Sequence, residues 1–177
     1  MHSIRQDMEE FREQLGEGSM QRAYRALLSF MMSLRTHFKN SEAGFPVSSL
    51  YQGYMDMTYF ALFPPSLKRQ GLKIAIVFNY DAFRFEVWLS GRNRHILEQY
   101  WELFKDSQWP AYRIATPATG MDSIVECDLA KDFDLSDPDA LTAIIEAGTV
   151  AFIDEMESFL SEHQPREEAR VSGNGSL

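Results

Sequence analysis

The sequence predicts a single α+β domain, with a largely antiparallel sheet of about five strands and helices packed on one side. Its 177 residues are the length of one domain. Its apolar residues recur every two positions in some segments and at helical spacing in others, and two alternating segments follow each other as in a hairpin. The predicted order is α-α-β-β-β-α-β-β-α. The domain is expected over residues 1–163, and residues 164–177 are expected to form a disordered tail because they are polar and contain Gly and Ser.

Two helices are predicted first. Ser3 and Gln6 have the spacing of a capping box, and apolar residues then recur at helical spacing as far as Leu15. Glycines end this helix, and a longer one follows over about residues 19–38. A strand is predicted over about residues 57–63, where two consecutive prolines close it because proline cannot continue a strand ladder.

Residues 72–80 and 83–89 predict an antiparallel hairpin. Folding the chain between them pairs every large aliphatic residue with another on one face: Phe78 with Phe85, Ile76 with Val87, and Ile74 with Leu89. A slip of one residue would bury Glu86 among the aliphatic side chains, so this register is favoured. Glu86 is therefore expected on the opposite face, which is half polar and either meets solvent or lines a cleft.

The rest of the chain predicts a helix, two strands and a final helix. The first of these helices follows Gly91 and ends near Ser107, and the strands lie at about residues 112–115 and 123–129. An Asp-Pro pair within residues 136–139 starts the final helix, which runs to about residue 160. Gly148 lies inside that helix, where another backbone is expected to pass close.

Composition excludes several classes of function. Seventeen basic against 26 acidic residues give a net charge of -9, which disfavours direct nucleic-acid binding and binding to anionic membranes. No apolar run reaches the roughly 18 residues that span a bilayer, and the first residues lack the pattern of a signal peptide. One cysteine, Cys127, allows no internal disulfide, so a cytoplasmic location is expected.

No common catalytic motif is present. The nucleotide-binding patterns GxGxxG and GxxxxGK[ST], the zinc-protease pattern HExxH and the esterase pattern GxSxG are all missing. The four histidines show no metal-ligand spacing, so neither a metal site nor a cofactor is predicted and the catalytic residues, if any, are unknown. Cys127 lies between two acidic residues that would raise its pKa, which favours a buried structural cysteine over a nucleophile.

Two groups of residues are candidates for a site. The first comprises Glu86, Glu126 and Asp128 on predicted strands, with Lys73 and Arg84 on the face of Glu86. Nucleases gather such residues around Mg²⁺, but the favoured interpretation is a solvated face with cross-strand ion pairs. The second is an anion site where a strand meets a helix start, with Gly91, Arg92 and Arg94 near free backbone N–H groups. The alternative is that both arginines extend into solvent or pair with nearby acids.

Six strings resemble one family of uncharacterised bacterial proteins, which forms a domain of unknown function. They are LRTHFKN, YQGYMDMTYF, LKIAIVF, RFEVWLSGRN, YWELFKDSQW and DALTAIIEAGT, and the resemblance covers about residues 3–161. It implies one cytoplasmic domain and brings no activity, cofactor or catalytic residue. The run from the hairpin into its helix also resembles, in pattern, accessory domains beside restriction-type nucleases.

We expect a soluble, non-catalytic binding module for a protein or a small anionic ligand, with a homo-oligomer possible. The alternatives are an uncatalogued enzyme using Arg84, Glu86 and Glu126, and an accessory protein of a nucleic-acid system. The aromatic-rich segment YQGYMDMTYF and the half-polar hairpin face favour binding. The ligand-binding candidates are Tyr54, Arg84, Glu86, Trp88, Gly91, Arg92 and Arg94.

Overall fold

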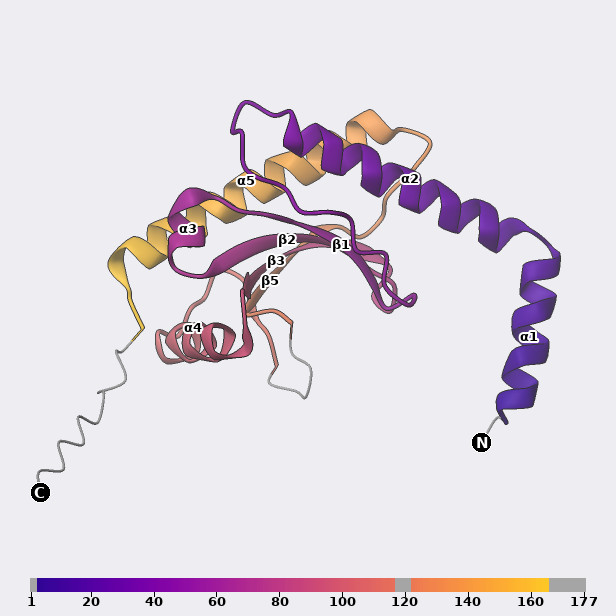
Figure 1. The fold of residues 1–177 in the computed structure, drawn as a ribbon, viewed down its shortest axis with the longest axis horizontal. Helices are drawn as coiled ribbons and strands as arrows, with labels where there is room; N and C mark the ends of the chain where they lie inside the picture. Colours follow the sequence, from indigo (N-terminus) through magenta and orange to yellow (C-terminus); the bar gives the residue numbers. More distant parts are fainter. Residues whose placement is uncertain (1–2, 117–121, 166–177) are drawn as a thin grey trace, which may run out of the picture.

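The structure, a computed structural model, describes residues 3–116 and 122–165 and shows an α+β domain in which helices pack on one antiparallel sheet (Figure 1). The predicted order of elements is confirmed, with one short helix, α3, in addition. Pro65 starts α3, at the point where the sequence predicted only the end of a strand. The elements are α1 (Ile4–Gly16), α2 (Ser19–Lys39), β1 (Met57–Leu62), α3 (Pro65–Arg69), β2 (Leu72–Asn79), β3 (Arg84–Gly91), α4 (Arg94–Asp106), β4 (Arg113–Ile114), β5 (Val125–Ala130) and α5 (Pro138–Glu162).

The five strands of the sheet have the order β1-β2-β3-β5-β4, and neighbouring strands are antiparallel. The predicted hairpin register is confirmed, since Phe78 lies opposite Phe85, Ile76 opposite Val87 and Ile74 opposite Leu89. β5 inserts between β3 and β4, although β4 precedes it in the sequence. This insertion brings the polar residues of β3, β4 and β5 together.

The main core lies between one face of the sheet and the long helices α2 and α5, which both cover that face (Figure 1). Ile74, Ile76 and Phe78 of β2 are fully buried there. α4 lies on the other side of the sheet, so the helices are not all on one side as the sequence suggested. Its apolar stripe finds partners at the end of the sheet and on α5, where Phe104 stacks on Phe159.

Two further sequence expectations concern α5 and the segment that follows it. The close neighbour of Gly148 is a side chain and not a backbone, because a Cβ built on this glycine would lie 2.5 Å from a methyl carbon of Leu129. α5 ends at Glu162. Most of the predicted tail, residues 166–177, lies outside the described residues.

In the described part of the chain, no helix has both the length and the apolar character needed to cross a membrane.

Candidate functional site

Polar residues gather on the face of the sheet that points away from α2 and α5. Strand alternation places Arg84, Glu86 and Trp88 of β3 on this face, because their neighbours Phe85 and Val87 point into the main core. In the register with β5, Glu86 lies opposite Asp128 and Trp88 lies opposite Glu126. β4 then places Arg113 opposite Glu126.

Glu86 is buried, with only 1% of its side chain exposed. Its Oε1 accepts a hydrogen bond from Arg84 Nε at 2.6 Å, and its Oε2 accepts one from Trp88 Nε1 at 2.7 Å. Arg113 Nη2 lies 3.7 Å from Oε1. The interpretation of this face as solvated is therefore wrong at Glu86, because residues two positions away on the same strand fold over its carboxylate and replace water as its partners.

Arg113 joins the carboxylates of β5, and sequence reasoning missed it. Its Nη2 donates to Glu126 Oε2 at 2.8 Å, and its Nη1 donates to Asp128 Oδ1 at 3.3 Å. Burial opposes the charge of Arg113, but the hydrogen bond and charge of Glu126, together with Asp128 and Glu86, raise its pKa. Alternation within residues 112–115 indicates which way Arg113 points, whereas its partners depend on the strand order.

Asp128 connects three cations. Arg84 Nε lies 3.1 Å from its Oδ1, and Lys131 Nζ lies 3.0 Å from its Oδ2. Burial favours the protonated form, but the hydrogen bond from Lys131 and the charges of Arg84 and Arg113 hold the pKa of Asp128 below its ordinary value. The three carboxylates predicted to share a face are thus brought together, each held by at least one arginine.

Cys127 lies in β5 opposite Val87, on the core side of the sheet. Burial, and next the charge of Asp128, raise the pKa of its thiol. These surroundings agree with a structural cysteine.

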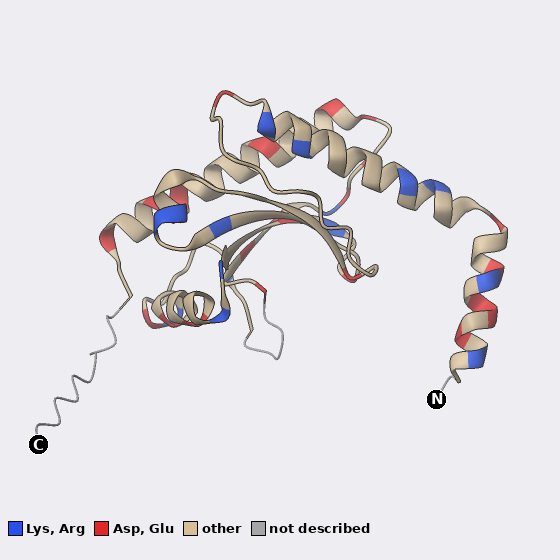
Figure 2. Ribbon diagram, viewed as in Figure 1, with Lys and Arg blue, Asp and Glu red and all other residues tan. Residues whose placement is uncertain are grey.

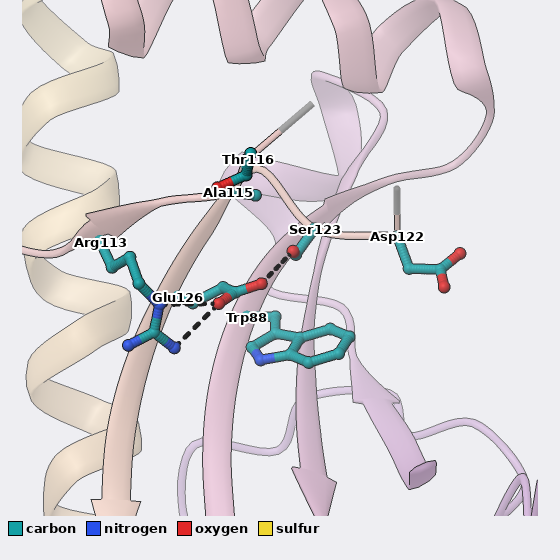
Figure 3. Close-up of a pocket in the computed structure, with 7 residues that line it drawn as sticks. All are labelled: Trp88, Arg113, Ala115, Thr116, Asp122, Ser123 and Glu126. Atoms are coloured by element: carbon teal, nitrogen blue, oxygen red, sulfur yellow. Dashed lines mark hydrogen bonds and ion pairs between the residues drawn. The ribbon is translucent and has the colours of Figure 1, made fainter. Parts of the chain in front are cut away.

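A cavity of about 350 Å³ opens beside this network (Figure 3). The indole of Trp88 lies next to the hydrogen bond that Ser123 Oγ donates to Glu126 Oε1 at 2.5 Å. The Asp122 carboxylate points away from the guanidinium of Arg113. The lining residues are Trp88, Arg113, Ala115, Thr116, Asp122, Ser123 and Glu126.

A second cavity, of about 300 Å³, adjoins the first at Asp122, which lines both. Ser90 borders this second cavity and holds Asp122 in place, since Ser90 Oγ donates to the Asp122 carbonyl oxygen at 2.6 Å. Cationic side chains, Lys73 and Arg94, line it together with Gly91 and Asn93 at the start of α4. The two cavities therefore share Asp122 as a wall. The first also has the aromatic Trp88 and the acidic Glu126, and the second has Lys73 and Arg94 together with the apolar or aromatic residues Tyr59, Ala75 and Leu97.

The residues of the predicted anion site separate in the structure. Gly91 and Arg94 line the second cavity, whereas the Arg92 side chain packs beside Gly71. Arg94 pairs with Glu98 at 2.8 Å, and both side chains are exposed. Asn93, which sequence reasoning did not single out, caps α4 by accepting a hydrogen bond from the backbone N–H of Ile96 at 2.9 Å.

Gly91 is required by the packing of α4. A Cβ on Gly91 would lie 2.7 Å from the backbone nitrogen of Leu97. The glycine thus allows the helix to approach the strand end.

Tyr54 and Lys73 complete the candidates. Tyr54 is 90% exposed in the loop before β1, at the hairpin end of the sheet, so it does not join the cavities at the other end of β3. Lys73 shares the face of Glu86 but lies near Ser90, away from the carboxylates of Glu86, Glu126 and Asp128.

Within residues 3–116 and 122–165, no three acidic, histidine or cysteine side chains are grouped so as to hold a metal ion.

Comparison with known proteins gives one match. The model of a family described as Domain of unknown function (DUF7000) matches residues 4–160. No curated protein and no solved structure matches the chain.

Proposed function

This chain belongs to the family described as Domain of unknown function (DUF7000), and we propose that it is a non-catalytic binding module for a small ligand that carries an anionic group. The observation that carries the proposal is the pair of adjoining cavities bounded by Asp122. Small-molecule sites are typically concave and combine an aromatic wall with a few polar groups, and these two cavities have that character.

The cavity lined by Lys73 and Arg94 suits the anionic group of the ligand, because its two cations outnumber its one carboxylate, Asp122. Among the described residues, Lys73 takes part in no ion pair, so its ammonium group is available. Arg94 is held by an exposed pair with Glu98, and such pairs contribute little free energy, so Arg94 exchanges partners readily. The Ser90 hydroxyl lies beside them but already donates its proton to the Asp122 carbonyl oxygen, so the charge of the two cations carries the attraction.

The cavity beside Trp88 suits the uncharged part of the ligand. Its two carboxylates, Asp122 and Glu126, repel an anion, and its single cation, Arg113, is already neutralised by carboxylates. An aromatic or otherwise planar group would contact the indole of Trp88.

Binding is better supported than catalysis. A general acid needs a proton at neutral pH, but the carboxylate of Asp128 has a lowered pKa and is held by cations. Glu86 is enclosed by Arg84 and Trp88. An enzyme that uses Glu86, Arg84 and Glu126 would have to break these ion pairs to free a reacting group.

The single cysteine also supports a reducing, cytoplasmic location.

Calorimetric titration at low ionic strength tests this function, with inorganic phosphate and adenosine monophosphate as the two probes. We expect saturable binding of the nucleotide, weakened about tenfold or more in Lys73→Ala and in Arg94→Ala because each removes a charged hydrogen bond. Arg92→Ala is the matched control, since this arginine belongs to the same segment but packs beside Gly71. Its affinity should equal that of the wild type.

Two results would contradict the proposal. One is the absence of saturable binding of either probe, and the other is equal binding by the wild type, Lys73→Ala and Arg94→Ala. Quenching of Trp88 fluorescence by the nucleotide, but not by phosphate, would support contact between the base and the indole. Because Trp101 and Trp109 also emit, the quenching is compared with that of Trp88→Phe after its folding has been checked by circular dichroism.

A further inference from the structure

Helix α1 exposes an apolar stripe. Ile4, Met8, Phe11 and Leu15 recur at spacings of four, three and four residues, and the first three side chains are 77%, 58% and 44% exposed. None of the residues of α1 is buried. Figure 1 shows α1 projecting from the end of α2 and separated from the sheet. The stripe therefore has no partner within the described part of the chain.

The direction of α1 is nevertheless defined by an elbow between the two helices. Gly18 adopts a positive φ of 72°, which favours glycine, and its N–H donates to the carbonyl of Leu15 at 3.1 Å. The side-chain amide of Gln21 donates to the same carbonyl at 2.7 Å. These bonds turn the chain between α1 and α2 and hold the apolar stripe in a defined orientation.

A helix like α1 is expected to need a partner. It has 13 residues, and isolated helices of about 12–15 residues are only marginally stable in water. Its capping box, in which Ser3 and Gln6 bond each other's backbone N–H groups, stabilises the first turn but covers no apolar area. Burial of the stripe would supply the missing stabilisation.

The spacing and the flanking charges fit a second copy of this chain as the partner. The stripe follows a coiled-coil repeat with Ile4 and Phe11 at d positions and Met8 and Leu15 at a positions. Asp7 then occupies a g position on one flank, and Arg12 occupies the e position five residues later on the other flank. In a parallel pair, g of one helix faces that e position of its partner.

We propose that two copies of this chain associate through a parallel pairing of their α1 helices, with Asp7 of each copy forming an ion pair with Arg12 of the other. The two ion pairs are related by a twofold axis, so the interface is closed. An antiparallel pairing would place e against e and g against g, so that arginines would face arginines. Figure 2 shows both signs of charge along α1.

A membrane surface fits the stripe less well than a second copy. Helices that lie on membranes carry mainly Lys and Arg on their polar face. α1 has Arg5 and Arg12, but four carboxylates: Asp7, Glu9, Glu10 and Glu13. Anionic lipid headgroups would therefore repel this helix.

Analytical ultracentrifugation of the full chain, from about 5 µM to about 500 µM, tests the proposal. We expect the mass to rise from the 20.4 kDa of one chain toward twice that value. Phe11→Asp should remain monomeric at every concentration, because it places a charge in the stripe. Unchanged urea unfolding of this variant's domain would show that the loss of dimer is not a loss of folding.

Charge reversal tests the register of the pairing. Asp7→Arg and Arg12→Asp should each weaken association at least tenfold, since each creates like-charge pairs, and the double variant should restore it. Glu13→Arg is the matched control: it reverses a charge on the far side of α1 and should leave association unchanged. Ile4→Cys, in a Cys127→Ser background, should form a disulfide-linked dimer on oxidation, because a parallel pair brings the two cysteines together.

Three results would overturn the proposal. A wild type that is monomeric at about 500 µM excludes the second copy as the partner. A double charge reversal that fails to restore association excludes the parallel register. Sedimentation of the monomer with vesicles of anionic lipid, lost in Phe11→Asp, would assign the stripe to a membrane surface instead.

Discussion

Replacing Glu86 with alanine is expected to lower the free energy of unfolding by about 2–4 kcal/mol. The change removes a buried carboxylate that accepts hydrogen bonds from Arg84 Nε at 2.6 Å and from Trp88 Nε1 at 2.7 Å. The indole N–H is then left without its acceptor inside the protein, and Arg84 loses its closer partner. A carboxylate on a solvated face, which the sequence favoured, would give a much smaller effect.

The magnitude follows from what remains after the change. Breaking a buried ion pair by removing one partner typically costs about 3–5 kcal/mol. Arg84 keeps Asp128 at 3.1 Å, and Arg113 keeps Glu126 at 2.8 Å, so neither arginine is left uncompensated and the cost is smaller. The unpaired indole N–H contributes about 1–3 kcal/mol of it. In a domain of this length, the melting temperature should fall by about 5–15 °C.

Urea unfolding followed by circular dichroism measures the effect. Glu86→Gln should lie between alanine and the wild type, because its amide oxygen still accepts from the indole N–H. Glu98→Ala is the control: it removes an exposed partner of Arg94 and should cost less than about 1 kcal/mol. A cost for Glu86→Ala no greater than that of this control would refute the reasoning and mean that water reaches the carboxylate.

Three further predictions follow from single residues. Gly91→Ala should destabilise the domain by about 1–3 kcal/mol in urea unfolding, because its Cβ would lie 2.7 Å from the nitrogen of Leu97; a neutral result would mean that α4 shifts freely. Because the pKa of Asp128 is lowered in the folded protein, its ionised form stabilises the fold above the ordinary aspartate pKa, and this stability is lost as the pH falls through the folded value. The stability difference between the wild type and Asp128→Asn should therefore be largest near neutral pH and shrink below about pH 4; a pH-independent difference would contradict the lowered pKa. Cys127 should react with iodoacetamide at neutral pH much more slowly in the folded than in the urea-unfolded protein, since burial raises the pKa of its thiol; equal rates would contradict the burial.

The hairpin shows what the alternation of apolar and polar residues along a strand can predict. The pairing of Ile76 with Val87 was predictable because side chains alternate faces with a period of two, so one register alone buries all the aliphatic residues. The same alternation correctly placed Glu86, Glu126 and Asp128 on the opposite face. It could not predict that Glu86 is buried, since its cover comes from the conformations of the Arg84 and Trp88 side chains.

The candidate site depended on information that no local pattern contains. Arg113 meets Glu126 only because β5 inserts between β3 and β4, and the order of strands is set by packing between distant segments. Lys73 and Arg94 differ in this respect, because the hairpin register places Lys73 opposite Ser90 and Arg94 follows the end of β3 by three residues. Their proximity could therefore be predicted, whereas the cavity that they line together with Tyr59 and Asp122 depends on the tertiary structure.

The sequence by itself determined the class of fold, the order of the main elements and the hairpin register, because periodicity, caps and turn residues act between near neighbours in the chain. Only the tertiary structure decided that α4 lies on the far side of the sheet, and that Gly91 accommodates this helix. It also decided that α1 keeps its apolar stripe exposed. An apolar stripe in a sequence shows that a helix needs a partner, but whether the same chain supplies that partner depends on the three-dimensional path of the backbone.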